Sequence, residues 1–504
     1  MSHINGFHNL TPKEAAEKIP DGATVAFSGF ANAGTAKAIP RALAARARML
    51  HEAGTPFRIR VLTGGACSET VDEPLAGSEA ISWRAAYQSA PALRIQINQQ
   101  NVEYLDMHLS RVGRTVLVGF FGKLDVAVIE ATDVTPDGRV YLSTSIGASP
   151  TFLRYADRVL IELNRAHSRR LPEMHDIFIM DPPPRRQPIP IHETMMRMGF
   201  PYAQVDPAKV IGIVETDEPD QVPDRGGPSP ANRKIAEHVV QFLLDEMEVG
   251  RIPREFLPLQ VGTGKTANGM MEALGNHPDI PPFKMYTLAI RDWFIQLMEQ
   301  GKLQGASASS LSLSQAVLKN VYENMDFFVP RIVLRPQEIS NDPGVVRRLG
   351  VIAVNSAIEV DIYGNANASH VFGTDMVNGI GGNGEFTRNS FLSFIVCPSI
   401  ARGGRISNVV PMIPHIDDNE HSVQIIVTDQ GLADLRGLGP MQRAKAIIEN
   451  CAHPAYRDYL YRYLENSRPG HIRHDLDTCF ELHLNLMEHG AMLPDLDLST
   501  VGEL

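Results

Sequence analysis

Residues 21–54 read DGATVAFSGFANAGTAKAIPRALAARARMLHEAG, and this stretch decides the fold class. Its apolar run at 23–27 has the length of a buried strand, and a glycine-containing loop follows it. Residues 35–52 then predict a helix that ends before Gly54. A strand, a loop and a helix in this order form the repeating unit of α/β proteins with parallel sheets.

The same rhythm continues along the chain. Thr11 and Glu14 form a predicted capping box, with Pro12 at the first helical position, so a short helix should reach Lys18. Runs of Val, Ile and Leu predict strands covered on both faces at 57–62, 124–131, 157–164, 257–261, 283–287, 351–362, 391–396 and 423–429. Further helices are predicted at 266–275, 289–300, 441–451 and 456–466. The alternation predicts an open α/β architecture.

Residues 216–232 interrupt this pattern. Their sequence, TDEPDQVPDRGGPSPAN, contains four prolines and a Gly-Gly pair, and it has no apolar period. Such a composition is typical of a linker. We therefore predict an N-terminal α/β domain at 1–215, a linker at 216–232, and a C-terminal α/β domain with a helical end at 233–504.

Composition excludes several classes of protein. The 504 residues include 47 basic and 58 acidic side chains, and the formal net charge is −11, which argues against a general nucleic-acid-binding surface. Four scattered cysteines are too few for a disulfide scaffold. The first twenty residues lack the pattern of a signal peptide, and the apolar runs are too interrupted for a transmembrane helix. We expect a cytoplasmic protein.

The sequence GTGKT at 262–266 resembles the end of a phosphate-binding loop. The full pattern requires a glycine at position 259, where this chain has Leu259. Because the loop precedes a predicted helix, three interpretations stay open: a nucleotide phosphate, another ligand beside a tight turn, or a purely structural turn.

Residues 379–384, GIGGNG, satisfy the spacing G-x-G-x-x-G. A dinucleotide fingerprint opens a helix, whereas here the polar residues 385–390 lead into a predicted strand. The context therefore argues against a dinucleotide. The four glycines still allow the backbone to approach a ligand closely, or they serve a turn with positive φ.

Single reactive side chains carry less information. Cys67 follows a glycine turn and is a candidate nucleophile, but a buried structural cysteine is the favoured interpretation. A possible metal cluster is interpreted as solvated loop residues, so no metal site is predicted: His415, Asp417, Asp418 and His421.

Read together, the glycine loops and other motifs are similar to a known family. Residues 21–34 resemble the first signature of class I coenzyme A transferases, although Ser28 stands where glycine is common and Ala36 where proline is common. Nine stretches between about residues 20 and 460 resemble the acetyl-CoA hydrolase and succinyl-CoA:acetate CoA-transferase branch: FGKLDVAVIEAT, LSTSIG, GASASSLSLS, NMDFF, EISNDPGVVRRLG, AIEVDIYGNAN, MVNGIGGNGEF, VTDQGLADLRGL and CAHPAYR. The resemblance implies two related open α/β domains with the active site in the cleft between them.

The resemblance also implies a chemistry that this chain cannot follow unchanged. In the family a glutamate attacks the acyl-CoA thioester and becomes a glutamyl-CoA thioester. The flanking residues Tyr286, Ile290, Asp292 and Gly301 keep their places, so the nucleophile's position is Leu288. Leucine has no nucleophilic atom. The family also carries an aspartate at position 292, so Asp292 is interpreted as structural.

Other parts of the implied site are present. The resemblance assigns the oxyanion hole to the backbone of Thr263 and Gly382, with Asn341 near the CoA thioester. It implies further CoA-binding positions at Gly264, Gly381 and Gly384. Asp429 matches the position of another family carboxylate. Trp293 and Phe294 stand where smaller residues are common, and they either shape the acyl pocket or belong to a helix core.

The main hypothesis is an acyl-CoA-processing enzyme that acts at the thioester of a small acyl-CoA. Hydrolysis, lyase-type chemistry and CoA transfer to a carboxylate all stay open, in each case without the usual glutamyl-CoA intermediate. The alternative is a catalytically inactive CoA-binding or regulatory subunit. Coenzyme A is expected as substrate rather than as a permanently bound cofactor, and the expected partners are acyl-CoA, a small carboxylate and a second copy of the chain.

Overall fold

The computed structural model describes residues 3–223, 226–262 and 264–498, and the chain divides into two compact units. Unit 1 comprises residues 1–224, 284–349 and 378–382, whereas unit 2 comprises 225–283, 350–377 and 383–504. The first passage between the units falls inside the predicted linker. The two later returns to unit 1 differ from the predicted pair of consecutive domains, because contacts between distant segments leave no local pattern in a sequence.

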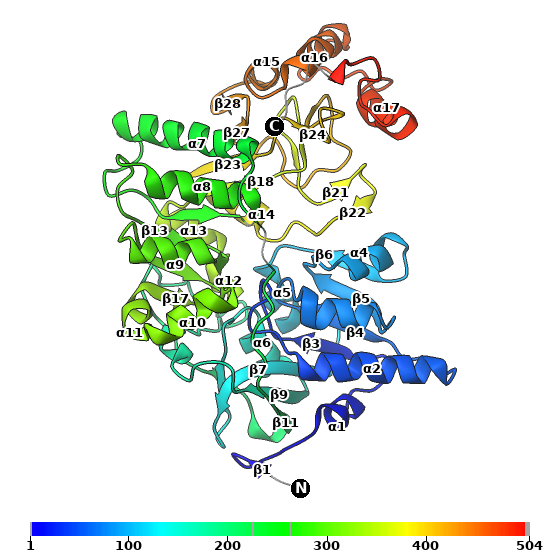
Figure 1. The fold of residues 1–504 in the computed structure, drawn as a ribbon, viewed down its shortest axis with the longest axis vertical. Helices are drawn as coiled ribbons and strands as arrows, with labels where there is room; N and C mark the ends of the chain where they lie inside the picture. Colours follow the sequence, from blue (N-terminus) through cyan, green and yellow to red (C-terminus); the bar gives the residue numbers. More distant parts are fainter. Residues whose placement is uncertain (1–2, 224–225, 263, 499–504) are drawn as a thin grey trace. The chain divides into compact units, whose positions relative to one another are not determined.

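The main sheet of unit 1 has nine strands (Figure 1). Its order is β10-β8-β7-β3-β4-β5-β6, and β9 pairs with β7 and with β11. The strands β3 to β7, β9 and β11 pair in parallel, whereas β8 and β10 are antiparallel additions. The bounds are β3 Thr24–Phe27, β4 Ile59–Thr63, β5 Ile81–Ala86, β6 Glu103–Asp106, β7 Val126–Val134, β8 Arg139–Leu142, β9 Arg158–Asn164, β10 Ala203–Gln204 and β11 Val210–Thr216.

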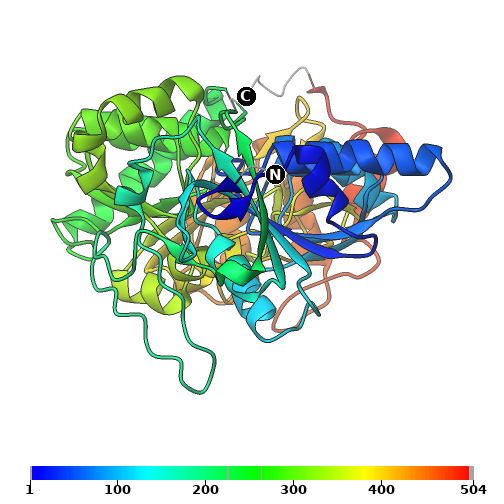
Figure 2. The ribbon, with the colours of Figure 1, turned by 90° about the horizontal axis from the view of Figure 1, so that it is seen from below.

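Helices α1 (Pro12–Glu17) and α2 (Ala38–Glu52) lie beside each other in this unit (Figure 2). The predicted capping box is confirmed, because Thr11 Oγ1 accepts the Glu14 N–H and the Glu14 carboxylate accepts the Thr11 N–H. The apolar faces of both helices join strands β3 and β4 in one core. The remaining helices of this part are α3 Glu73–Ala76, α4 Pro91–Asn98, α5 Arg111–Leu117 and α6 Ser149–Tyr155.

Helix α2 begins at Ala38 rather than at the predicted residue 35. The buried carboxylate of Glu162, from β9, accepts the N–H groups of Lys37, Ala38 and Ile39 at 2.8, 3.1 and 2.6 Å. These are donors of the first turn, which have no partner within a helix. A carboxylate distant in sequence therefore fixes where the helix begins.

The segment 284–349 adds a second group of strands to unit 1. Strands β13, β15 and β17 are neighbours in the order β17-β15-β13, and the short strands β14 and β16 pair in parallel. The predicted helix at 289–300 begins only at Asp292, because Ala289 and Ile290 form β14. The bounds are β13 Phe283–Tyr286, β14 Ala289–Ile290, β15 Leu303–Ala308, β16 Ser310–Leu311, β17 Ile332–Leu334, α9 Asp292–Glu299, α10 Gln315–Glu323, α11 Met325–Phe328, α12 Gln337–Ser340 and α13 Pro343–Leu349.

Unit 2 contains five neighbouring strands in the order β12-β18-β23-β27-β28. The first four pair in parallel, and β28 is antiparallel to β27. The predicted strand at 351–362 is in fact two strands, β18 and β19, and helix α17 was not predicted. The bounds are β12 Leu259–Val261, β18 Ile352–Ser356, β19 Glu359–Asp361, β23 Leu392–Val396, β27 Ile425–Thr428, β28 Gly431–Asp434, α7 Pro230–Glu248, α8 Lys265–Asn276, α14 Asn383–Asn389, α15 Pro440–Asn450, α16 Pro454–Asn466 and α17 Glu481–His489.

The predicted linker is only partly a free connection. Asp220 is 3% exposed, and its carboxylate accepts the Gly34 N–H and contacts the side chains of Lys37 and Thr144 within unit 1. At its other end, residues 230–232 already form the first turn of α7.

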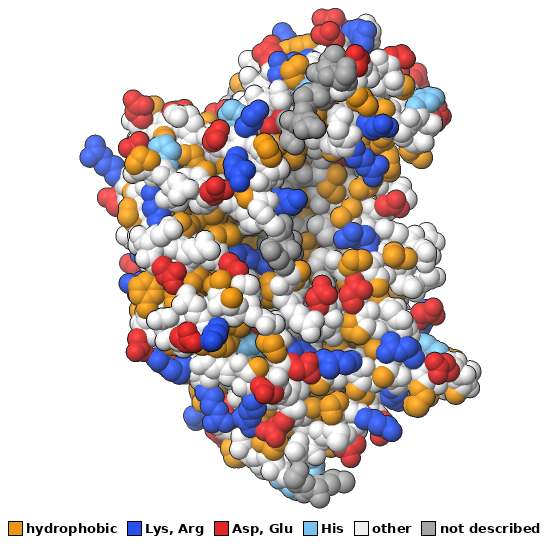
Figure 3. All heavy atoms as spheres, in the orientation of Figure 1, with side chains coloured by type: hydrophobic (Ala, Val, Ile, Leu, Met, Phe, Trp, Pro, Cys, Tyr) orange, Lys and Arg blue, Asp and Glu red, His pale blue; other side chains and the backbone are white. Residues whose placement is uncertain are grey.

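Over the face shown in Figure 3, Lys and Arg side chains are interspersed with Asp and Glu. Within the described ranges, no helix combines the length and the apolar character that a membrane crossing requires.

Candidate active site

Three of the predicted site residues converge inside unit 1. Leu288 follows β13, Asn341 follows α12, and Gly382 ends the short segment 378–382. A Cβ atom placed on Gly382 would lie 2.8 Å from Asn341 Nδ2 and 3.0 Å from Leu288 Cδ1. The absence of a side chain at Gly382 therefore allows its backbone to lie directly against both neighbours.

Backbone hydrogen bonds hold the segment that carries Leu288. The Thr287 N–H donates to the Ser307 carbonyl at 2.9 Å, and the Ser309 N–H donates to the Leu288 carbonyl at 2.9 Å. Tyr286 is fully buried, and its hydroxyl donates to the Ile339 carbonyl at 2.7 Å. The half-buried Leu288 side chain is thus presented from a backbone fixed on both sides.

Asn341 is completely buried, and a hydroxyl orients its amide group. Ser340 Oγ lies 3.0 Å from Asn341 Oδ1, and the same hydroxyl lies 2.8 Å from Ser309 Oγ. Because the amide oxygen faces Ser340, the amide nitrogen is the atom that faces Gly382. The site therefore combines one apolar side chain, one amide donor and one glycine backbone.

The remaining predicted positions are distributed differently. Gly381 also belongs to unit 1, where it has φ +58°, and a Cβ there would lie 3.2 Å from the ring of Tyr87. Gly264 precedes α8, has φ +113° and faces open space, and Gly384 lies within α14; both belong to unit 2. Thr263 lies outside the described residues.

The glycine-rich segment departs from its predicted context. A helix, α14 (Asn383–Asn389), begins within its last two residues, although the polar residues 385–390 had predicted no helix. The preceding strand β22 (Asp375–Met376) has only two residues and forms a hairpin with β21 (His370–Val371). A dinucleotide fingerprint follows a long strand of a parallel sheet, so the interpretation against a dinucleotide remains.

Two carboxylates beside the family motifs have local structural partners. Asp292 accepts the N–H of Ser314, the residue before α10, at 2.8 Å, so it holds the start of a neighbouring helix. Asp429 accepts from the backbone N–H and the hydroxyl of Ser399. Both arrangements agree with structural roles.

Trp293 and Phe294 differ from each other. Phe294 is 1% exposed and packs in α9 among other buried side chains, whereas Trp293 is only half-buried. The two rings stack with their centroids 3.8 Å apart. The helix-core interpretation therefore fits Phe294.

Cys67 is fully buried, and burial raises the pKa of its thiol well above the ordinary value. A buried neutral thiol is a poor nucleophile, which fits the structural interpretation.

The possible metal cluster of the sequence analysis is only partly solvated: His415, Asp417, Asp418 and His421. His421 is exposed, as expected for a loop, but Asp418 is 4% exposed, and burial raises its pKa to about 7. Asp417 accepts the N–H of Ala368 at 2.7 Å and contacts the hydroxyl of Ser369. These aspartates hold a loop of unit 2, which corrects the interpretation of all four residues as solvated.

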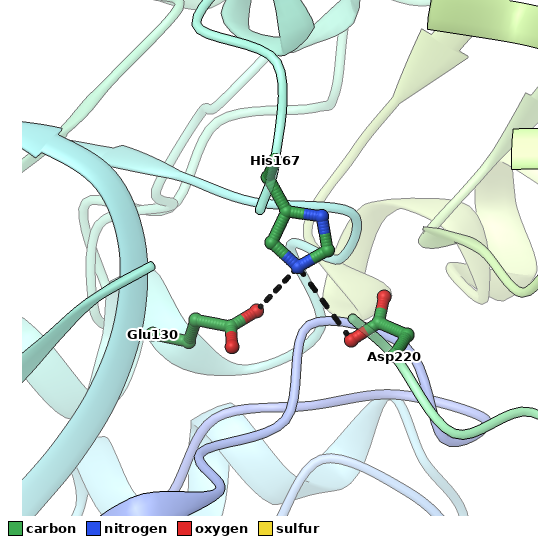
Figure 4. Close-up of side chains that lie close together, drawn as sticks. All are labelled: Glu130, His167 and Asp220. Carbon is green, nitrogen blue, oxygen red and sulfur yellow. Dashed lines mark ion pairs between the residues drawn. The ribbon is translucent and has the colours of Figure 1, made fainter. Parts of the chain in front are cut away.

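A different charged cluster, not predicted from the sequence, lies deep in unit 1. Figure 4 shows the carboxylates of Glu130 and Asp220 directed toward Nε2 of His167, at 3.2 and 3.7 Å. The Lys37 ammonium lies between the same two carboxylates and also donates to the Thr35 carbonyl at 2.8 Å. All four titratable side chains are at most 5% exposed. We call these residues the buried quartet: Lys37, Glu130, His167 and Asp220.

The protonation states of the buried quartet support one another. Burial alone would lower the pKa of His167, but Asp220 and Glu130 outweigh it and raise that pKa. Burial alone would raise the pKa of Glu130, but Lys37 and His167 hold it below its ordinary value. Contacts between groups of opposite charge therefore offset the cost of burying them away from water.

Within the described ranges, Glu130, His167 and Asp220 form the one group of three potential metal ligands. The Lys37 ammonium already provides a positive charge between their carboxylates, and its three donors have acceptors at Thr35, Glu130 and Asp220. The cluster thus fits a structural network better than a metal centre. The sequence contained one signal for it, the charged Glu130 inside the apolar strand β7.

Comparisons with known proteins agree over nearly the whole chain. Residues 7–215 match the family model of the acetyl-CoA hydrolase/transferase N-terminal domain, and residues 318–464 match that of the C-terminal domain. The chain is 54% identical to the propanoyl-CoA:succinate CoA transferase of Escherichia coli (strain K12), over 96% of this chain and 98% of that protein. It is 40% identical to the succinyl-CoA:acetate CoA-transferase of Clostridium kluyveri, over 96% and 90%.

A solved structure supports the fold independently. The crystal structure of RipA from Yersinia pestis matches with a TM-score of 0.69 at 21% identity, covering 90% of this chain and 96% of that one. At this identity the likeness concerns the fold alone.

Proposed function

Because this chain belongs to the acetyl-CoA hydrolase/transferase family, we propose that it acts at the thioester of a small acyl-CoA without forming a glutamyl-CoA intermediate at position 288. The family is enzymatic, and the named relatives give no support to a catalytically inactive subunit. The observation that carries the proposal is the convergence of an apolar Leu288 with Asn341 and the backbone of Gly382.

This arrangement suits the stabilisation of an oxyanion without a protein nucleophile. A thioester carbonyl against the Gly382 backbone would receive an N–H donor where negative charge develops, and the Asn341 amide would be the adjacent polar group. Preorganised donors of this kind lower the barrier to acyl transfer by several kcal/mol, about 2.7–4 kcal/mol for one donor. Leu288 would occupy the space beside the Gly382 backbone without offering a competing nucleophile.

The first reaction that we propose is hydrolysis. The oxygen of a water molecule attacks the thioester carbon, and the electron pair of the C=O bond moves to the carbonyl oxygen. The tetrahedral intermediate then collapses, the C–S bond breaks, and coenzyme A leaves as thiolate. One proton of the water passes to the departing sulfur, and the other passes to solvent as the acid product ionises. No residue forms a covalent bond in this sequence.

The second reaction is CoA transfer to a carboxylate, which the 54% identity to a propanoyl-CoA:succinate CoA transferase favours. Here the acceptor carboxylate itself attacks the thioester carbon and expels CoA thiolate, which leaves a mixed anhydride of the two acids. The thiolate then attacks the acceptor's carbonyl carbon, and the donor acid leaves as carboxylate. Both acids and CoA must occupy the site together, so the kinetics should be sequential rather than ping-pong.

Turnover of defined thioesters tests this proposal. Purified protein should release free thiol from acetyl-, propanoyl- or succinyl-CoA, and mass spectrometry should detect the new thioester when succinate or acetate is added. Absence of both products with every thioester, together with calorimetric binding of CoA, would instead establish an inactive CoA-binding subunit.

Three further properties belong to the same proposal. Coenzyme A enters as substrate, and no resident cofactor takes part in the steps above. We place the protein in the cytoplasm, which its four free, buried cysteines support, because disulfides are rare in reducing compartments. We also propose a homodimer, which light scattering after gel filtration would test.

A further inference from the structure

We propose that Asp106 and Tyr104 are positioning residues for catalysis: from the end of strand β6, they fix the glycine loop that presents the Gly382 backbone to the substrate. This inference rests on the proposed function, because it assigns Gly382 to the thioester oxyanion. The glycine loop is defined here as residues 378–382, the short segment that belongs to unit 1 while its neighbours in sequence belong to unit 2.

The glycine loop is bound to unit 1 by specific polar contacts. Asp106 Oδ2 accepts the Ile380 N–H at 2.7 Å. The Tyr104 hydroxyl lies 2.8 Å from the carbonyl oxygens of both Asn378 and Ala86, so its single proton is shared between them. Side chains of β6 therefore contact the first and third residues of the glycine loop, Asn378 and Ile380.

The glycine loop lies so close to β6 that no side chain would fit at Gly379. Gly379 has φ +147°, and a Cβ there would lie 2.6 Å from Asp106 Oδ1 and 2.9 Å from the Tyr104 hydroxyl. Any residue other than glycine would push the loop away from β6. A second close contact lies at Gly381, where a Cβ atom would lie 3.2 Å from the ring of Tyr87.

The location of the anchor is typical of ligand sites. Asp106 and Ala86 are the last residues of β6 and β5, two parallel strands. In α/β proteins, ligands bind outside the carboxyl ends of parallel strands. Two residues beyond Ile380, the loop reaches Gly382, which lies against Leu288 and Asn341. The anchored residues 378 and 380 and the candidate oxyanion donor at Gly382 thus belong to one five-residue segment.

The role of Asp106 is geometric rather than electrostatic. A negative charge near the thioester would oppose an oxyanion, so its contribution must come from holding the Ile380 N–H through a charge-assisted hydrogen bond. Displacing a group by about 1 Å can reduce a rate about a hundredfold. Asp106→Ala should therefore reduce kcat about 10- to 100-fold with KM changed less than about threefold.

A conservative variant separates positioning from charge. Asp106→Asn keeps a carbonyl acceptor for the Ile380 N–H, so it should retain kcat within about fivefold of the wild type. Tyr104→Phe removes only the hydroxyl and should reduce kcat by an intermediate factor. Asp125→Asn is the matched control, because Asp125 is also partly buried and accepts one backbone N–H, that of Thr24 at 2.9 Å, away from the loop.

A double-mutant cycle tests whether Asp106 acts through Gly382. The effect of Asp106→Ala on kcat should shrink to less than about threefold in a Gly382→Ala background, since the donor is already displaced there. Additive effects, or full activity of both Asp106→Ala and Tyr104→Phe, would overturn the proposal.

Hydrogen exchange makes this test independent of turnover. Asp106→Ala should accelerate amide exchange in residues 378–382 and leave the peptides around Asp125 unchanged. Wild-type protein without thioester activity but with this exchange response would contradict the proposed function while upholding the anchor. Unchanged exchange in the loop of an active enzyme would contradict the anchor and leave the proposed function standing. If Asp106→Ala fails to fold, Tyr104→Phe, which removes the hydroxyl that contacts the Asn378 carbonyl, provides the same readouts.

Discussion

Two regions of unit 1 contrast sharply in charge. The buried quartet holds four titratable side chains in contact, whereas the site around Gly382 presents leucine at the position where the family resemblance implies a carboxylate. The side chains of the buried quartet lie together because a charged group that is buried away from water needs a partner of opposite charge. The second region places an amide and a glycine backbone beside an apolar side chain. On the function that we propose, the reaction occurs there, and the dense cluster of charges has a structural role.

The largest effect should come from breaking the buried quartet. Lys37→Met removes the ammonium group that contacts both Glu130 and Asp220, and removing one partner of a buried ion pair costs about 3–5 kcal/mol. Urea unfolding should show this loss. Lys123→Met, which removes an exposed partner of Asp157, is the control and should leave the midpoint almost unchanged. Equal effects of the two variants would contradict the role assigned to the quartet.

Next in size is the loss of activity from Gly382→Val. The branched side chain would collide with Asn341 Nδ2 and Leu288 and displace the thioester carbonyl from the backbone donor. We expect thiol release to fall about 100- to 1,000-fold, the loss typical of one oxyanion donor. Circular dichroism should show a retained fold.

Gly301→Ala provides the control for this variant. Gly301 has positive φ, but a Cβ there meets open space, so alanine introduces backbone strain without touching the site. It should lose some stability and keep its activity. A folded Gly382→Val protein as active as this control would make Gly382 a simple turn residue.

Leu288→Glu should restore part of the missing chemistry. A carboxylate at the end of β13 would lie beside the Asn341 amide, and transfer of CoA to acetate or succinate should rise above the wild-type rate. Burial raises the pKa of a carboxyl group, so this gained activity should increase with pH. Leu288→Gln, which has the same shape without a nucleophile, should show no gain. A gain in both variants would mean that polarity alone matters.

The smallest effect is the pH dependence of stability that His167 contributes. The folded-state pKa of His167 is raised, so its protonation stabilises the fold fully below the unfolded value of about 6.5, and this contribution is lost as pH rises through the folded value. The groups that face its ring are Glu130, Asp220, Lys37 and Tyr322. His167→Gln should flatten the dependence of unfolding free energy on pH above about 6.5. An unchanged slope would show that His167 stays neutral.

Local patterns explain what the sequence predicted. The capping box at Thr11 and the β3–loop–α2 unit depend on neighbours in the chain, so their residue types revealed them. The start of α2 could not be predicted, because it depends on Glu162, more than a hundred residues away. The assignment of residues 284–349 to unit 1 could not be predicted for the same reason, since this segment packs with a part of the chain that precedes it by many residues.

The same distinction between local and long-range contacts applies to the residues of the candidate site. Leu288, Asn341 and Gly382 were found through a resemblance that encodes long-range contacts, and the structure brings these three together. Asp106 and the buried quartet carried almost no local signal. Their partners come from separate strands and loops, and only the fold unites them.

Peptide mapping during turnover tests most directly whether the reaction avoids a protein-bound CoA. Trypsin cleaves after Lys284, Arg291 and Lys302, so position 288 and Asp292 fall on separate peptides, 285–291 and 292–302. After acid quenching with acyl-CoA present, both wild-type peptides should keep their unmodified masses, while Leu288→Glu should show a CoA thioester on 285–291. A CoA adduct on 292–302 of the wild-type protein would contradict the account, because it would make Asp292 the nucleophile.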